Sequence, residues 1–144
     1  MASHSIFVYY HPPHTADHTS HSPFGHVMYA NMPNKGETAT LTSPTMANLQ
    51  TQCLRFYFLR GGAGVSLRLY QSHVSSGRVD PTLWQLNETH LVNEWIRVQQ
   101  NLLITGDPVT VNFEAKKADY SSSPILLDDI SLTPFQCDPP ITCR

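Results

Sequence analysis

The sequence predicts an all-β fold, a sandwich or jelly roll of about seven to nine short strands. Three observations carry this prediction. Apolar and polar residues alternate at a period of two in several segments, turn residues separate these segments at short intervals, and no segment shows the period of an amphipathic helix. The length of 144 residues is that of a single domain with one hydrophobic core.

The clearest alternation lies in residues 53–59, where Leu54, Phe56 and Phe58 share one face of the expected strand. A glycine-rich turn follows, and residues 65–70 then alternate in the same way. We therefore predict that these two strands form a hairpin.

A second hairpin is predicted from residues 95–99 and 109–114, because Gly106, Asp107 and Pro108 supply a turn between two further alternating segments. Other segments have the same strand character. They are residues 25–31, 37–42 and 124–132.

The composition excludes two classes of protein. Nine Lys and Arg residues stand against eleven Asp and Glu, and the net charge of −2 with no cationic block excludes a nucleic-acid surface. No apolar run approaches the roughly 20 residues that span a bilayer, so no transmembrane segment is expected.

Residues 1–10 lack a basic start, and we expect no secretory signal peptide in this chain.

Eight short segments between residues 16 and 137 carry a family resemblance. Residues 17–19 read Asp-His-Thr, residues 39–44 read Ala-Thr-Leu-Thr-Ser-Pro, and a cysteine-led aromatic strand starts at Cys53. Their order and spacing resemble the MAM domain, an extracellular module of receptor phosphatases, neuropilins and meprin-type proteases. The other matching pieces are the glycine and aromatic segment 24–29, the glycine turn and strand 61–69, Trp84, Trp95, Phe-Glu-Ala at 113–115, and Ile-Leu-Leu-Asp-Asp-Ile at 125–130, followed by Cys137.

The resemblance implies an antiparallel β-sandwich of jelly-roll type for residues 16–137. A MAM domain opens with a cysteine pair and a first β segment, and nothing of that kind precedes Asp17, so we expect a domain truncated at its start. Residues 1–15 are an atypical N-terminal segment in which residues 6–10 are the candidate for a substitute strand. Residues 138–144 form a C-terminal tail or the start of a linker, because consecutive prolines end a strand.

Three cysteines leave at least one thiol without a partner in the chain. The resemblance implies a disulfide between Cys53 and Cys137, which leaves Cys143 free or available to a following module or partner chain. A bond between Cys137 and Cys143 is the competing connectivity, and three free thiols are the simplest alternative.

The resemblance also suggests a cation. Some MAM domains hold a calcium or sodium ion near acidic side chains, and Asp17, Asp128 and Asp129 match the acidic positions of the family. Oxygen ligands suit such an ion. The alternative is that Asp17 caps a turn while one of the adjacent aspartates accepts backbone hydrogen bonds. No other cofactor is expected, since the histidines that crowd the first 26 residues lack the ligand spacing of a zinc site.

Asn87 begins the sequon Asn-Glu-Thr and is the candidate glycosylation site. Catalytic motifs are missing from the sequence. The glycine-rich segment 61–64 lacks the Gly-Lys-Ser/Thr ending of a phosphate loop, and there is no Gly-x-Ser-x-Gly elbow. We therefore predict no enzymatic activity.

These observations lead to an expected function. The chain is predicted to be a non-catalytic extracellular recognition or adhesion module, part of a longer parent protein at the cell surface. Its partners would be other extracellular or cell-surface proteins, including a second copy of itself, and not nucleic acid. The alternatives are a carbohydrate-binding β-sandwich, in which exposed aromatic rings stack on sugars, and an accessory domain of a secreted protease.

Overall fold

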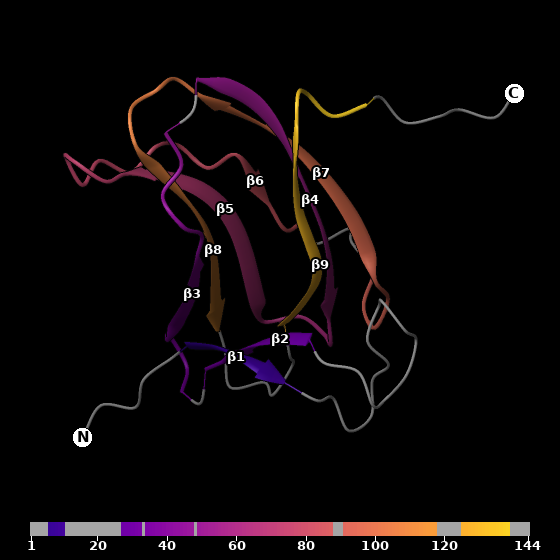
Figure 1. The fold of residues 1–144 in the computed structure, drawn as a ribbon. Helices are drawn as coiled ribbons and strands as arrows, with labels where there is room; N and C mark the ends of the chain where they lie inside the picture. Colours follow the sequence, from indigo (N-terminus) through magenta and orange to yellow (C-terminus); the bar gives the residue numbers. More distant parts are fainter. Residues whose placement is uncertain are drawn as a thin grey trace, which may run out of the picture.

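A computed structural model describes residues 6–10, 27–32, 34–47, 49–87, 91–117 and 125–138. These residues form nine strands in two sheets that pack face to face (Figure 1). They contain no helix, and thus no helical segment that is long and apolar enough to cross a membrane. The predicted all-β sandwich of jelly-roll type is confirmed.

All neighbouring strands are antiparallel. The five-stranded sheet, here sheet A, has the strand order β1 (Ile6–Tyr10), β2 (Val27–Asn31), β9 (Ile125–Pro134), β4 (Gln50–Arg60) and β7 (Ile96–Ile104). The four-stranded sheet, sheet B, has the order β3 (Thr38–Thr42), β8 (Val109–Lys117), β5 (Val65–His73) and β6 (Trp84–Gln85).

Both predicted hairpins are wrong. Strand β4 lies in sheet A and β5 in sheet B, and β7 and β8 are divided between the sheets in the same way. The two turns therefore carry the chain across the core instead of joining hydrogen-bonded neighbours. An alternating pattern shows which face of a strand is buried, but it does not show which strand is the hydrogen-bonded partner. Two consecutive strands have the same pattern whether they form a hairpin or lie in opposite sheets.

The core lies between the inner faces of the two sheets. Phe56 and Phe58 of β4 are fully buried opposite Leu67 and Leu69 of β5. Trp84 closes this core from the short strand β6, and its ring meets that of Phe56 edge to face with 5.3 Å between centroids. The alternation found in the sequence thus buries one side of each long strand.

Strand β1 pairs along its whole length with β2, which pairs in turn with β9. The segment named as the candidate substitute strand, residues 6–10, is therefore a strand of sheet A. Asp17, together with the rest of residues 11–26, lies outside the described residues.

Candidate functional site

The outer face of sheet A carries the features with the clearest functional character. On β4, alternate residues point away from the core, and the strand register places them in rows with residues of β7 and β9. We call this surface the outer face. The first row, at the end of β4, is Tyr29, Leu126 and Leu59, and Trp95 packs against it. Toward the start of β4, the next rows are Asp128, Tyr57 and Arg97; Ser131, Arg55 and Gln99; Thr133, Cys53 and Asn101; and finally Thr51 and Leu103.

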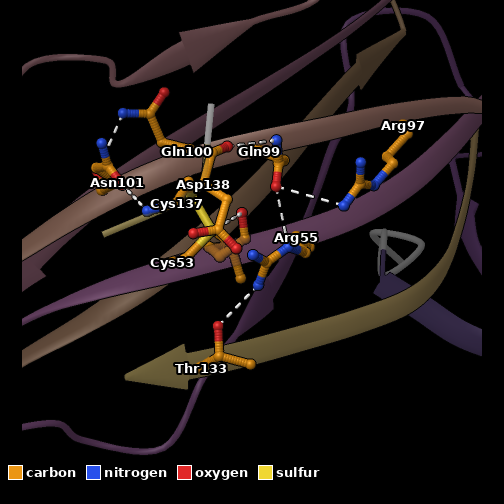
Figure 2. Close-up of a disulfide and its surroundings, with 10 residues drawn as sticks. Cys53, Arg55, Arg97, Gln99, Gln100, Asn101, Thr133, Cys137 and Asp138 are labelled. Atoms are coloured by element: carbon orange, nitrogen blue, oxygen red, sulfur yellow. Dashed lines mark hydrogen bonds between the residues drawn. A yellow bond between two sulfur atoms is a disulfide. The ribbon is translucent and has the colours of Figure 1, made fainter. Parts of the chain in front are cut away.

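A disulfide joins Cys53 on this face to Cys137, as the family resemblance implied (Figure 2). The two residues are 84 positions apart in sequence, and Cys53 is almost fully buried. The bond fixes the segment after β9 to the middle strands of the sheet. Cys143 lies outside the described residues, so its partner stays a prediction.

Residues 135–138 form a turn that crosses the outer face toward β7. The backbone N–H of Cys137 donates to Oδ1 of Asn101 at 2.6 Å, and Nε2 of Gln99 lies 3.5 Å from the carbonyl oxygen of Asp138 (Figure 2). Phe135 opens the turn with a φ of 71°, a conformation that is rare for a bulky residue. The disulfide and the Asn101 hydrogen bond hold this strained backbone in place.

Two arginines occupy the centre of the outer face. Nε of Arg55 donates to Oε1 of Gln99 at 3.0 Å and its Nη1 donates to Thr133 at 2.7 Å. Arg97 donates to the same Gln99 oxygen at 3.3 Å (Figure 2). Each guanidinium is thereby oriented by the sheet, with donors left for a partner because one Arg has five N–H groups.

Exposed apolar side chains gather where the outer face meets the turn. Leu49 (78% exposed), Phe135 (77%) and Leu103 (65%) are the most exposed large apolar residues among those described. Leu103 lies opposite Thr51, two residues after Leu49, and Pro134 lies opposite Gln52 just before Phe135. We call these three residues the apolar corner. They were not predicted from the sequence. The one signal in the sequence is Leu103, an apolar residue that follows the polar Arg97, Gln99 and Asn101 on the outer face of β7.

Asp128 and Asp129 lie at an irregularity of β9. The register with β4 shifts here, so that one residue of β4 faces two residues of β9, and Asp129 takes a φ of 50°. The N–H of Asp129 donates to Oδ1 of Asp128 at 2.9 Å, which matches the alternative that one aspartate accepts a backbone hydrogen bond. Among the described residues no three His, Cys, Asp or Glu side chains form a metal-binding group. Since Asp17 lies outside those residues, the cation site stays a prediction.

Asn87 is exposed, two residues after β6. The rest of its sequon, residues 88–90, lies outside the described part of the chain. An exposed position after a strand is compatible with glycosylation, which stays a prediction.

A cluster around His73 was also missed from the sequence. Nδ1 of His73 lies 2.6 Å from Asp107, and Nε2 lies 2.9 Å from Asp80 and 2.9 Å from Nη2 of Arg78. His73 is buried at the end of β5, while Asp107 belongs to the turn between β7 and β8. The cluster ties together two loops at one end of the sandwich.

An apolar cleft of about 430 Å³ opens between the sheets beside β3 and β9. Leu41, Met46, Leu54, Phe113 and Leu132 are among its lining residues, and the polar residues of the lining are Thr42, Ser43 and Ser131. None of its lining side chains titrates in the physiological range. The cleft therefore offers no acid, base or activated nucleophile.

The outer face of sheet B is polar. Arg68 pairs with Glu114 at 2.9 Å and lies over the ring of Tyr70, 4.3 Å from its centroid. The hydrogen bond to Glu114 is the main reason that the pKa of Arg68 is raised, so this guanidinium stays charged at any usable pH. Hydroxyl and amide side chains surround the pair, including Thr40, Thr42 and Asn112.

Solved structures of similar fold include carbohydrate-binding modules. A CBM4 module shares 15% identity at a TM-score of 0.55, covering 89% of this chain and 94% of its own, and a family 16 module shares 16% at 0.55, covering 88% and 86%. The Clostridium thermocellum xylanase 10B, with CBM22-1 and GH10 modules and solved with xylohexaose, shares 8% identity at 0.59 over 93% of this chain and 25% of its own. At such identities the likeness concerns the fold.

Comparison of the sequence with family models identifies the family as well as the fold. The MAM domain family (meprin/A5/mu) matches residues 4–138, a range that contains the disulfide, every strand and the turn of the outer face. The match begins ahead of residue 16, where the resemblance found by motif began, and it includes β1. On this evidence the chain belongs to the MAM domain family.

Proposed function

We propose that this chain is a non-catalytic recognition or adhesion module that binds other proteins through the outer face of sheet A. The observation that carries the proposal is the apolar corner. Leu49, Leu103 and Phe135 are exposed together beside a turn that a disulfide holds. Apolar side chains grouped in this way on a soluble domain mark an interaction site.

The rest of the outer face has the composition of a protein interface. Tyr57, Arg55 and Arg97 lie in the rows next to the disulfide, and Tyr and Arg are enriched at the energetic centres of interfaces. These side chains stand on a paired sheet whose backbone is fixed. A rigid surface loses little conformational entropy when it binds, which favours affinity.

Two observations support a role without catalysis. The cleft between the sheets has no titratable lining side chain, and the His73 cluster uses its histidine to tie two loops together. The sequence motifs of phosphate binding and of nucleophilic hydrolases are likewise missing. The membership in an extracellular family and the disulfide support a location outside the cell, as part of a longer parent protein.

The test is binding to cells. The chain, secreted with an added leader and fused to a fluorescent tag, is applied to cells as wild type and as the variants Leu49→Ser and Phe135→Ser. Both exchanges should weaken binding at least about tenfold if the apolar corner is a hot spot. The matched control is Leu91→Ser, which alters a leucine that is 57% exposed before the other end of β7.

The chemistry of the partner is tested on the same cells. Mild protease treatment of the cells should abolish binding, whereas glycosidase treatment should leave it. Equal binding by Phe135→Ser and wild type contradicts the proposal. Binding that survives protease treatment and disappears with glycosidases favours the alternative role.

That alternative is carbohydrate binding, and one observation favours it. The outer face of sheet B presents the Tyr70 ring among hydroxyl, amide and charged groups, and carbohydrate-binding modules are among the solved structures of similar fold. The Arg68 guanidinium covers one face of the ring, so a sugar would stack on the opposite face. Loss of glycan binding in Tyr70→Ala, with cell binding unaffected by Phe135→Ser, would establish this second role.

A further inference from the structure

Strand β7 is a long edge of sheet A. All nine of its residues pair with β4, and its other side has no hydrogen-bonded partner strand among the described residues. Proteins usually protect such an edge with lysines, prolines, bulges or short length, because a free edge invites another strand. The sequence of β7 contains no lysine, proline or glycine, and Arg97 is its one charged residue.

The other edges are less open. Strand β6 has two residues, and the five-residue β3 lies close to β1 (Figure 1). The longest unprotected edge of the described sheets is therefore β7, the strand that also carries Leu103 of the apolar corner.

We propose that β7 pairs antiparallel with β7 of a second copy of this chain, about a two-fold axis at Gln100. The two five-stranded sheets then become one continuous sheet. This inference goes beyond the proposed function. It concerns the strand edge, whereas the proposed function concerns the outer face.

The residues of β7 are complementary to themselves in this register. A two-fold axis at Gln100 places Ile96 opposite Ile104, and Val98 opposite Leu102. These apolar pairs flank Gln100, which lies on the same inner face and meets its own copy at the axis. On the outer face, Gln99 lies opposite Asn101 of the second copy. The oxygen of Gln99 already accepts from Arg55 and Arg97, so the hydrogen bond across the axis uses the amide N–H of Gln99 as donor. Shifting one strand by a single residue would exchange the two faces and destroy these matches.

The remaining outer pair explains the exposure of Leu103. In this register Leu103, 65% exposed in the single chain, lies opposite Arg97 of the second copy. The aliphatic stem of an arginine covers apolar surface while its guanidinium stays in water. Because Arg97 is the only charge on the strand, no like charges meet across the axis.

The expected dimer is weak and reversible. A nine-residue strand is about 30 Å long, and pairing along one edge buries an area at the low end of the range for specific interfaces, below about 1,200 Å². Weak contacts of this kind become effective when many copies are held on one surface.

Sedimentation equilibrium of the whole oxidised chain tests the register through charge. Wild type should dimerise with a Kd between roughly 10 µM and 1 mM, as expected for a small interface. The Kd of the dimer should increase in the order Leu103→Glu, Leu103→Gln, Leu103→Lys. The introduced glutamate would face an arginine and the introduced lysine would face a like charge, so the Kd values of these two variants should differ roughly tenfold. Leu91→Glu and Leu91→Lys are the matched controls and should both leave the Kd at its wild-type value.

The same three Leu103 variants, made in a chain that also carries Arg97→Glu, test whether residue 103 faces residue 97 of the second copy. In Arg97→Glu, the order of the three Leu103 variants should reverse, because the opposite residue now carries a negative charge. Hydrogen exchange should also show amides of β7 becoming protected as the protein concentration rises. The inference is overturned if wild type stays monomeric to 1 mM, if the order does not reverse, or if protection on dimerisation falls on other strands; roughly 1 mM is the weak limit of specific association. Loss of cell binding in Phe135→Ser would still stand after such a result, so the two proposals fail separately.

Discussion

The imidazole of His73 lies 2.6 Å from a carboxylate oxygen of Asp107, across a contact that joins the end of β5 to the turn between β7 and β8. On the other side of the ring, Nε2 faces Asp80 at 2.9 Å. A backbone hydrogen bond joins the same two segments, in which the N–H of Val74 donates to the carbonyl oxygen of Pro108. One buried side chain thus holds two loops that belong to strands far apart in sequence.

Replacing His73 by alanine should destabilise the fold by about 2 kcal/mol, because hydrogen bonds to charged partners are lost and Asp80 keeps only its contact with Arg78. Urea unfolding followed by fluorescence measures the change. The half-exposed position of Asp107 limits the loss, since water replaces part of its hydrogen bonding. Val74→Ala is the control: it shortens an exposed neighbour and should cost less than about 0.5 kcal/mol. Equal losses in the two variants would show that the cluster contributes nothing.

Strands and buried faces were predictable from the sequence, because each follows from local alternation. Phe56, Phe58, Leu67 and Leu69 are buried as their periodicity indicated. The pairing of strands was not predictable in the same way. The turn at residues 61–64 joins two strands whose apolar faces meet across the core, and the same alternation would serve a hairpin.

In the candidate site, too, some features were predictable from the sequence and others were not. The Cys53–Cys137 bond followed from the family resemblance, because the order of motifs identified both cysteines. The apolar corner did not, since Leu49, Leu103 and Phe135 come from three strand ends that only the register brings together. A buried histidine such as His73 is likewise invisible to pattern analysis, because its partners lie 7 and 34 residues away.

The disulfide should supply a large share of the stability. Replacing both Cys53 and Cys137 by alanine removes a cross-link between residues 84 positions apart, which costs about 4.5 kcal/mol in the chain-entropy model. Denaturant unfolding of the oxidised proteins gives the value. Cys143→Ser should leave the unfolding midpoint unchanged, and a loss as large as that of the double variant would instead support a role for Cys143 in the native bond.

Peptide mapping checks the same bond directly. Trypsin leaves Cys137 and Cys143 on one peptide, because no lysine or arginine lies between them. Additional cleavage before Asp138 separates the two, so the partner of Cys53 can be read from the mass of the linked peptide. A peptide that links Cys53 to the fragment starting at Asp138 would contradict the pairing.

Asp129 should tolerate glycine better than a β-branched residue. Its φ of 50° lies in the left-handed region, where Cβ approaches the following carbonyl oxygen. Asp129→Gly should therefore change the free energy of unfolding little, whereas Asp129→Val should cost about 1–2 kcal/mol or more. The control is Ser131→Val, an exposed position of β9 at which a β-branched residue suits the strand. If Asp129→Val and Ser131→Val are equally stable, the irregularity of β9 does not depend on the residue at 129.

Asn87 should carry an N-linked glycan when the chain passes through the secretory pathway. The asparagine is exposed just after β6, and the sequon Asn-Glu-Thr is intact in the sequence. Secretion from mammalian cells with an added leader should give a product whose mobility rises on treatment with peptide-N-glycosidase F. Both Asn87→Gln and Thr89→Ala should abolish the shift, while Asn34→Gln, at an exposed asparagine outside any sequon, should keep it. A secreted wild-type chain that is insensitive to the glycosidase would mean that the enzyme of glycan transfer does not reach Asn87 before the sandwich folds.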